Sequence, residues 1–482
     1  MKTKKMEQRE IGEHVNPTIV PMETENKMGR MPMGHLVLAM GVPLMMSMLV
    51  QAIYNIVDSL YCSHITDVAI PNAGDKAIAA LTFAFPIQML MIAFNTGTGV
   101  GVNAILSRYL GAKNRENASK VAGNAIFLAI CMYIVFLLFG IFGTNAFFTT
   151  QTSDPVIYSY GTSYIRICTT CAFGTMGFFA FEKVLQATGK TGLAMLAQLS
   201  GAMANIILDP FFIFGWCGLP AMGTAGAAVA TVIGQCISLA VGLTAHIRLN
   251  KEVDNGIRYL KPNGSILKDI YMIGIPAIIM QMLVSFMNYG MNTILAGISD
   301  SMVSAFGIYN KLQSFIFMPC FGLNNALIPI VGYSYGARRF DRIRSALKYG
   351  MIDVLIIMAF GMSLMLLFSP QIVGIFAVSD EVQGLAVTAM HIICLSFLFV
   401  GANTILQGFF QALGHGFYSL AISVVRYILV LLPLAIIFTR KNITVWYTFP
   451  VSEFCALILA LIMLYSMKKK SIAKSLLQIP QQ

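Results

Sequence analysis

The chain contains twelve apolar stretches, each long enough to cross the hydrocarbon core of a bilayer as a single helix. They fall at 34–61, 78–106, 121–143, 157–183, 193–214, 223–246, 266–294, 303–332, 348–375, 383–410, 417–438 and 444–466. The core of a soluble domain does not need so many stretches of this length, and 57% of the 482 residues are hydrophobic whereas only 11% are charged. The sequence therefore predicts an all-α polytopic membrane protein.

Basic residues gather on one side of these twelve spans. The amino-terminal region, the loops after spans 2, 6 and 8, and the carboxyl-terminal region are all basic, whereas the opposite loops hold only Lys76, Arg440 and Lys441. Because Lys and Arg are retained on the cytoplasmic side, we expect both termini to be cytoplasmic and the protein to lie in the cell's plasma (inner) membrane. The net charge of +11 is then explained by topology, and no nucleic-acid partner is expected.

Two halves of the chain resemble each other. Leu185-Gln-Ala-Thr-Gly189 recurs as Phe410-Gln-Ala-Leu-Gly414, and Leu110-Gly-Ala-Lys113 recurs as Tyr335-Gly-Ala-Arg338, both 225 residues later. Each half holds six spans, so the repeats are parallel and related by a pseudo-twofold axis along the membrane normal, with a transport site expected between them. The predicted domains are a polar tail (1–33), an amino lobe (34–250), a linker (251–265), a carboxyl lobe (266–467) and a basic tail (468–482).

The fifth span carries a carboxylate, Asp209, with Asn205 one helical turn earlier on the same face. A carboxylate in hydrocarbon is costly, so its side chain is expected to face the protein interior or a water-filled cavity. Pro210 directly follows and frees a backbone carbonyl one turn back. These features indicate a cation site for H⁺ or Na⁺; a helix-end aspartate that reaches interfacial water is the alternative. Asp58 in the first span is the expected partner.

Spans 1 and 7 carry matching polar stripes at helical spacing. The stripes are Ser47, Gln51, Asn55 and Asp58 in span 1, and Gln281, Ser285, Asn288 and Asn292 in span 7. Such faces line a cavity or contact other helices, because a lipid-facing stripe would be costly. We therefore predict a substrate cavity that includes the following residues: Gln51, Asn55, Gln281, Asn288, Asn292 and, from span 10, His391. For His391 a hydrogen-bonded structural role is the alternative.

Several motifs together resemble the multidrug and toxic compound extrusion (MATE) family of bacterial exporters. They are Asn55-Ile-Val-Asp58, the Asn205 to Pro210 segment, Phe315-Ile-Phe-Met-Pro319, the run from Pro329 to Arg338, and Pro450-Val-Ser-Glu453. The resemblance spans essentially the whole chain. It implies two six-helix lobes in a V-shaped arrangement, alternating access to a central cavity, and an amino-lobe cation site at Asp58, Asn205, Asp209 and Thr231.

The resemblance also implies a function. We expect a secondary antiporter, not an enzyme, that exports lipophilic organic cations in exchange for H⁺ or Na⁺ and needs no cofactor. Because spans 7, 8 and 10 lack an acid away from their ends, we expect ion coupling to reside in the amino lobe. A flippase for lipid-linked or other amphiphilic substrates is the alternative, which Arg166 and Arg426 keep open. A monomer is expected.

Three further features have less specific interpretations. Gly189-Lys190-Thr191 looks like the end of a phosphate loop, but Val184 stands where a glycine is needed, so no ATPase site is expected. Glu182 and Lys183 are interpreted as a pair that snorkels to the interface, with a proton site as the alternative. The cysteines of Cys168-x-x-Cys171 are interpreted as small buried hydrophobes.

Overall fold

The computed structural model describes residues 26–65, 73–376 and 378–477, and within these ranges every regular element is helical. The amino-terminal half comprises α1 (Lys27–Arg30), α2 (Met33–Ser63), α3 (Ala73–Gly111), α4 (Arg115–Leu138), α5 (Thr144–Gln151), α6 (Pro155–Thr170), α7 (Phe173–Ala187), α8 (Thr191–Phe214) and α9 (Thr224–Leu249). The carboxyl-terminal half comprises α10 (Gly264–Ala296), α11 (Asp300–Gly336), α12 (Phe340–Gly374), α13 (Asp380–Ile393), α14 (Phe397–Ala412), α15 (Gly416–Val424), α16 (Leu432–Arg440) and α17 (Thr448–Leu477). π-Helical segments, Phe139–Gly143 and Val425–Leu431, join α4 to α5 and α15 to α16. The basic residues predicted to mark the tail before residue 26 lie outside the described ranges.

Eleven of the described helical runs are long and apolar enough to cross a membrane, and the bent pair α6 and α7 makes a twelfth span. The prediction of one continuous helix over 157–183 is wrong in this detail, because the two helices meet at 48°. The hydroxyls of Thr169 and Thr170 donate to the carbonyls of Ile165 and Arg166, and such back-bonding bends helices. The predicted number of spans and the all-α class are confirmed.

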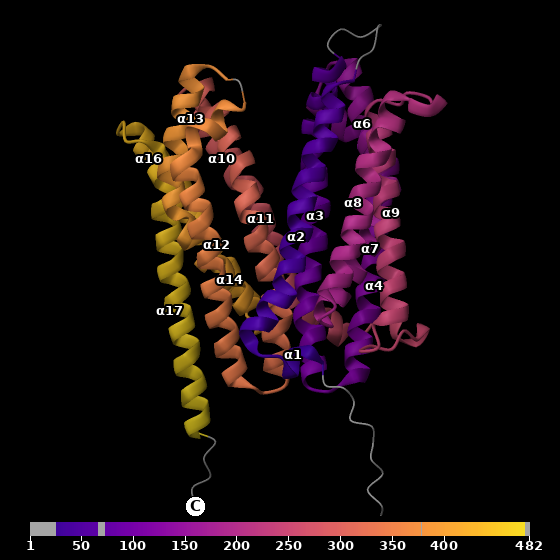
Figure 1. The fold of residues 1–482 in the computed structure, drawn as a ribbon, viewed down its shortest axis with the longest axis vertical. Helices are drawn as coiled ribbons and strands as arrows, with labels where there is room; N and C mark the ends of the chain where they lie inside the picture. Colours follow the sequence, from indigo (N-terminus) through magenta and orange to yellow (C-terminus); the bar gives the residue numbers. More distant parts are fainter. Residues whose placement is uncertain (1–25, 66–72, 377, 478–482) are drawn as a thin grey trace, which may run out of the picture.

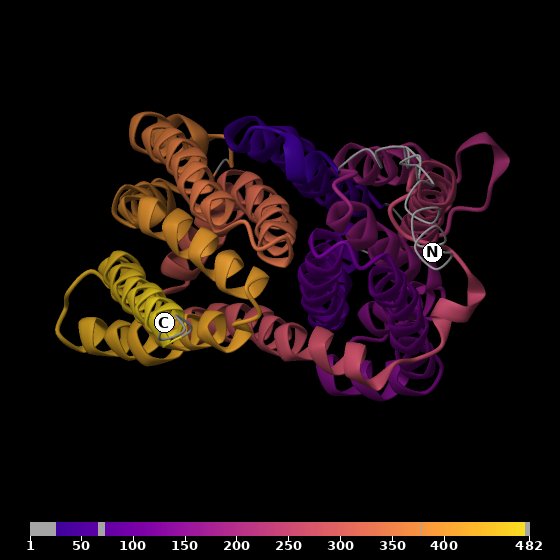
Figure 2. The ribbon, with the colours of Figure 1, turned by 90° about the horizontal axis from the view of Figure 1, so that it is seen from below.

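The helices form two bundles that stand side by side (Figures 1 and 2), with α2–α9 in one and α10–α17 in the other. Each bundle corresponds to one copy of the sequence repeat. The two bundles contact each other through α2 and α3 on one side and α10 and α11 on the other. The predicted two-lobe architecture therefore agrees with the structure, and we call the bundles the amino lobe and the carboxyl lobe.

The contacts between the lobes follow the internal symmetry. A Cβ atom on Gly97 would lie 2.7 Å from the backbone nitrogen of Ile278, and one on Gly322 would lie 2.6 Å from the Cα atom of Met45. Gly97 and Gly322 are 225 residues apart and so occupy equivalent places in the repeat. Since any side chain at either position would push the helices apart, glycine allows the two lobes to approach closely.

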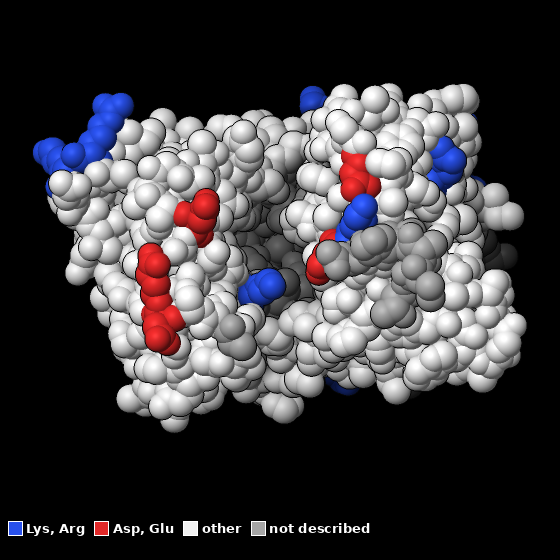
Figure 3. Space-filling view, turned by 90° about the horizontal axis from the view of Figure 1, so that it is seen from above, with Lys and Arg blue, Asp and Glu red and all other residues white. Residues whose placement is uncertain are grey.

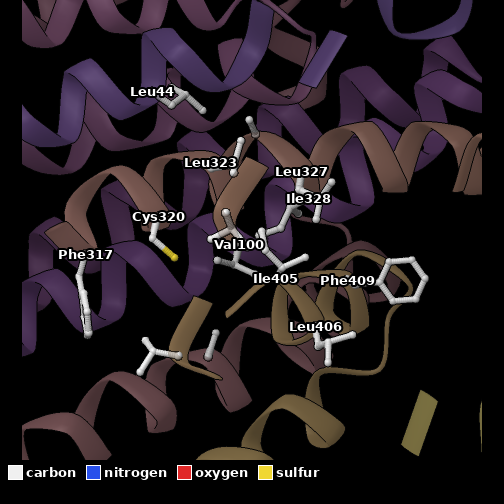
Figure 4. Close-up of a cluster of buried hydrophobic side chains, with 14 of the residues drawn as sticks. Leu44, Val100, Phe317, Cys320, Leu323, Leu327, Ile328, Ile405, Leu406 and Phe409 are labelled. Atoms are coloured by element: carbon white, nitrogen blue, oxygen red, sulfur yellow. The ribbon is translucent and has the colours of Figure 1, made fainter. Parts of the chain in front are cut away.

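A shared apolar core joins the lobes around these glycines. Figure 4 shows Leu44 and Val100 of the amino lobe beside side chains of α11 and α14, which include Leu323 and Ile405. Near the ends of α3 and α11, Gly111 approaches the carbonyl of Tyr333 too closely to accept a Cβ atom. The opposite face, where α6 and α13 begin, is hollowed between the lobes (Figure 3). The molecule is therefore closed at the end where α1 lies and open at the other.

Candidate cation-coupling site

Three amino-lobe helices bring the predicted cation-site residues into one region. Asp58 comes from α2, Asn205 and Asp209 from α8, and Thr231 from α9. The Nδ2 atom of Asn205 donates to Asp209 Oδ1 at 3.2 Å and to Thr231 Oγ1 at 3.3 Å. The four-residue spacing on α8 places the first bond along one helix face, and the second joins α8 to α9. Both amide hydrogens of Asn205 are therefore used to hold oxygen acceptors in place.

The site is buried and rich in acceptors. Asp58 is 8% exposed, Asn205 is 3% exposed and Asp209 is fully buried. Asp58 Oδ1, Asn205 Oδ1 and Asp209 Oδ2 have no hydrogen-bond donor among the described residues. Asp58 is also near enough to Asp209 for their negative charges to repel each other. Buried oxygens without donors fit the binding of a proton or of a small cation that takes oxygen ligands.

A small cavity adjoins Asn205 between α8 and α9. It has a volume of about 10 Å³, enough for roughly one water molecule. Its lining comprises Tyr54, Gln198, Gly201, Ala202, Asn205, Thr231, Gly234, Gln235 and Ser238. The cavity depends on Gly201, because a Cβ atom there would collide with the carbonyl of Gly234 and the hydroxyl of Ser238.

Sequence reasoning missed several polar residues of this cavity, among them Tyr54 and Gln198. Tyr54 lies four residues before Asp58 on α2, and Gln198 lies seven residues before Asn205 on α8. Both spacings correspond to whole helical turns, so each side chain shares a face with a predicted site residue. This periodicity was the signal available in the sequence, and it extends the polar face of α8 by two turns.

The residues predicted for the substrate cavity occupy varied environments. Gln51, Gln281 and Asn288 are half-buried, whereas Asn55 and Asn292 are exposed. His391 lies within the carboxyl lobe, where its Nε2 atom is 2.8 Å from the hydroxyl of the buried Ser369 on α12. None of these six side chains lines the cavity beside Asn205. Their role in binding substrate stays a prediction.

Two other charged groups within the lobes, Arg426 and Arg166, have partners. The guanidinium of Arg426 pairs with the carboxylate of Glu453 in the carboxyl lobe, and Asn403 Nδ2 donates to the same carboxylate at 3.0 Å. The Arg166 guanidinium is exposed and donates to Asn145 Oδ1 at 2.7 Å. Arg426 and Arg166 are the two cations on which the flippase alternative depended, and both have partners within their own lobe.

The interpretation of Glu182 and Lys183 as a snorkelling pair is wrong. Each residue is only 4% exposed, and Lys183 Nζ lies 3.5 Å from Glu182 Oε2. Gln186 joins them, since it donates to Glu182 Oε1 at 2.8 Å and accepts from Lys183 at 3.1 Å. Lys183 packs along Gly99 of α3, whose missing side chain leaves room for the lysine stem. The pair is retained inside the lobe because a local polar network satisfies it.

Two parallel six-span lobes, one of which holds buried acids without a cationic partner among the described residues, are typical of the class of membrane transporters built from internal repeats. The MatE family model matches residues 43–211 and 276–437, which is more than half of the chain and includes part of each lobe. The chain therefore belongs to the MatE family of transporters.

Individual relatives agree with this assignment. The chain is 24% identical to a multidrug export protein of Staphylococcus haemolyticus, over 89% of this chain and 92% of that protein. It is 27% identical to a probable multidrug resistance protein of Bacillus subtilis, over 87% of this chain and 90% of that protein. The fold matches a multidrug resistance MATE transporter solved in an outward-facing conformation, with a TM-score of 0.84, 24% identity, and coverage of 94% and 99% of the two chains.

Proposed function

We propose that this protein is a secondary multidrug exporter that exchanges lipophilic organic cations for H⁺ or Na⁺. The observation that carries the proposal is the group of buried, donor-free carboxylate oxygens of Asp58 and Asp209, which Asn205 and Thr231 support. The names of the relatives from Staphylococcus haemolyticus and Bacillus subtilis support drug export. The positive-inside pattern supports cytoplasmic termini, and then the hollow in Figure 3 opens to the outside.

In the proposed mechanism, cation binding to the amino lobe drives a change in how the lobes pack. Two carboxylates in a low-dielectric site repel each other, so a proton or Na⁺ entering from outside relieves that repulsion. Helix α2 carries Asp58 and also contacts α11 across the lobe boundary. A rearrangement of α2 would therefore change the packing of both lobes. Exchange of one monovalent cation for another moves no net charge, so the concentration gradient of H⁺ or Na⁺ drives it: a tenfold ion gradient supplies about 1.4 kcal/mol, enough for roughly a tenfold substrate gradient.

The flippase alternative draws less support. A carrier for anionic lipid-linked substrates would need unpaired cations facing its cavity. Arg426 is neutralised by Glu453, and Arg166 lies on an exposed surface beside Asn145. A basic side chain borders the hollow in Figure 3, but the buried charges for which the described residues provide no counter-ion are the acids Asp58 and Asp209, which favours cationic cargo.

The experiment is transport of an ethidium-like dye in vesicles that contain the purified protein, with pH and Na⁺ gradients imposed separately. We expect one of the two gradients to drive dye accumulation, and Asp209→Asn to abolish it without loss of folded protein. The matched control is Asp353→Asn on α12, an acid of the carboxyl lobe that we expect to be dispensable. Undiminished gradient-driven transport by Asp209→Asn would refute the coupling site.

A further inference from the structure

A basic pocket lies at the closed end of the molecule, far along α8 from Asp209. It has a volume of about 170 Å³, many times that of the cavity of about 10 Å³ beside Asn205. Its lining comprises Asn26, Lys27, Arg30, Thr188, Gly189, Lys190 and Glu252. Three of these seven residues are cations and one is an acid. The pocket has no place in the exchange of drug and cation proposed above.

The lysines of this pocket are held together at an electrostatic cost. Burial and the neighbouring positive charge of Lys190 lower the pKa of Lys27. The two lysines come from segments more than 160 residues apart, so their approach is imposed by the fold and not by chain connectivity. Two ammonium groups that converge on a cavity favour an anion between them, because an anion turns repulsion into attraction.

The α8 helix adds to the positive character of the site. Lys190 is the N-cap of this helix and makes no side-chain capping bond; the N–H of Leu193 already donates to the Lys190 carbonyl at 3.0 Å, so the first-turn donors left without a side-chain cap are those of Thr191 and Gly192. The next residue, Thr191, is fully buried, and its hydroxyl has no partner among the described residues. The amino end of a helix carries partial positive charge and provides donors for phosphate oxygens.

The glycine of the Gly189-Lys190-Thr191 sequence has a structural role at this pocket. Gly189 has a φ of +81°, a left-handed conformation that glycine adopts without strain. A Cβ atom at this position would also lie 3.2 Å from Cε of Lys27. Glycine therefore turns the chain into α8 and lets the amino-terminal segment approach closely.

The same amino-terminal segment connects the two lobes. Asn26 Nδ2 donates to the carbonyl of Thr188 in the amino lobe at 3.0 Å. From the carboxyl lobe, Arg339 donates to the carbonyl of Gly29 at 2.6 Å, and Arg342 donates to the carbonyl of Met28 at 2.8 Å. Figure 1 shows α1 at the lower end of the molecule, between the bundles. Whatever steadies this segment therefore steadies the closed end.

We propose that the pocket formed by Lys27, Arg30 and Lys190 binds a phosphate-bearing anion, which fastens the amino-terminal segment across the closed ends of both lobes. The shared chemistry is a phosphate group, from either an anionic lipid headgroup or a soluble phosphate compound. A bound anion strengthens the state in which this end is closed, because opening it separates the segment from one lobe.

Binding to the purified full-length protein tests the proposal with two probes. The first is pyrophosphate added to protein in phosphatidylcholine nanodiscs, and the second is phosphatidylglycerol built into the nanodiscs without pyrophosphate. We expect at least one probe to raise the thermal unfolding midpoint of the wild type. Lys27→Gln/Lys190→Gln should weaken that binding about tenfold or more. The responding probe identifies the source of the phosphate group.

The matched control removes two positive charges elsewhere at the same end. Arg344→Gln/Lys348→Gln changes exposed side chains of α12 and should leave probe affinity within about twofold of the wild type. If the lysine variant fails to fold, Arg30→Gln tests the pocket at an exposed side chain and should weaken binding several-fold. The proposal is overturned if neither probe binds the wild type, or if site and control variants weaken binding equally. Dye transport is measured in the same lysine and arginine variants. A variant that loses probe binding but keeps gradient-driven transport separates the anion pocket from the coupling site that Asp209→Asn tests.

Discussion

The two lobes repeat one fold, but two buried acids of the amino lobe lack a cationic partner whereas the buried acid of the carboxyl lobe has one; the amino lobe also holds the buried pair of Glu182 and Lys183. In the amino lobe, Asp58 and Asp209 have no cationic side chain beside them among the described residues, and oxygen atoms of both lack donors. In the carboxyl lobe, Glu453 is buried to a similar degree but pairs with Arg426. A lobe whose acids are unpaired can take up a mobile cation, whereas a lobe that carries its own counter-ion has no need of one.

The repeat locates the origin of this difference. An offset of 225 residues places Arg426 opposite Gly201 (426 − 225 = 201). Gly201 borders the cavity beside Asn205, whereas Arg426 fills its own position with a guanidinium that reaches Glu453. A change from no side chain to a long cationic one thus separates a lobe with a small polar cavity from a lobe sealed by an ion pair.

Transport should show the largest difference between the lobes. We expect Asp58→Asn to reduce gradient-driven dye transport to the level of protein-free vesicles, because the site then lacks one of its two exchangeable charges. Arg426→Gln/Glu453→Gln neutralises the carboxyl-lobe pair as a whole and should keep transport within about threefold of the wild type. The initial rates of dye transport are compared between the two variants and the wild type at matched amounts of folded protein. Equal loss in both variants would mean that the two lobes share the coupling.

The second prediction concerns stability. Arg426→Met leaves Glu453 buried with no cation, and we expect a loss of about 3–5 kcal/mol in the free energy of unfolding. Arg426→Met/Glu453→Leu removes both charges and should recover most of that loss, since well-packed apolar residues can replace a buried pair. Chemical denaturation in detergent measures both variants. If the double variant is no more stable than the single one, the stabilising contribution comes from packing of the arginine and not from charge balance.

The third prediction concerns the space at Gly201. A Cβ atom there meets the backbone of Gly234, so Gly201→Ala should force α8 and α9 apart and destabilise the protein by about 1–3 kcal/mol. Gly192→Ala lies on the same helix with no atom within 4 Å of its new methyl group. That control should be neutral or stabilise by up to about 1 kcal/mol, because alanine is the better helix former. Similar losses for both variants would contradict the close approach of the two helices.

The sequence predicted the features that repeat along the chain. Apolar length gave the spans, and the duplicated Gln-Ala segments around Gln186 and Gln411 gave the two lobes. Helical spacing placed Asn205 and Asp209 on one face, which their hydrogen bond confirms. The sequence shows that an acid lies within a membrane span, but it does not show whether a cationic side chain neutralises that acid.

What the sequence could not predict depends on contacts between distant segments. The pairing of Arg426 with Glu453 depends on how α17 packs against the π-helical segment 425–431. The burial of Lys183 depends on the space left by Gly99, a residue 84 positions away (183 − 99 = 84). The bend between α6 and α7 arises from threonine hydroxyls without any proline to announce it. Periodicity specifies a face, and only tertiary packing specifies what that face meets.

The smallest effect is expected for an ion pair outside the membrane spans, which contrasts with the buried pair of Arg426 and Glu453. Lys76 Nζ lies 2.9 Å from Asp154 Oδ2, and about a third of each side chain is exposed. The hydrogen bond from Lys76, followed by those from the backbone N–H groups of Ile157 and Val156, lowers the pKa of Asp154. Because water screens exposed pairs, Lys76→Met should lower the unfolding midpoint only slightly at pH 7.

The pH dependence of that small effect gives the sharper test. A carboxylate whose pKa is lower in the folded state stabilises the fold above its unfolded-state pKa, and the stabilisation disappears as pH falls through the folded-state value. The difference between wild type and Lys76→Met should therefore be present at pH 7 and vanish once Asp154 is protonated, below its ordinary pKa of 3.8. Unfolding midpoints measured across that range provide the comparison. A difference that persists unchanged in acid would assign the effect to packing of the lysine stem, and the exposed pair would then contribute no charge-dependent stability.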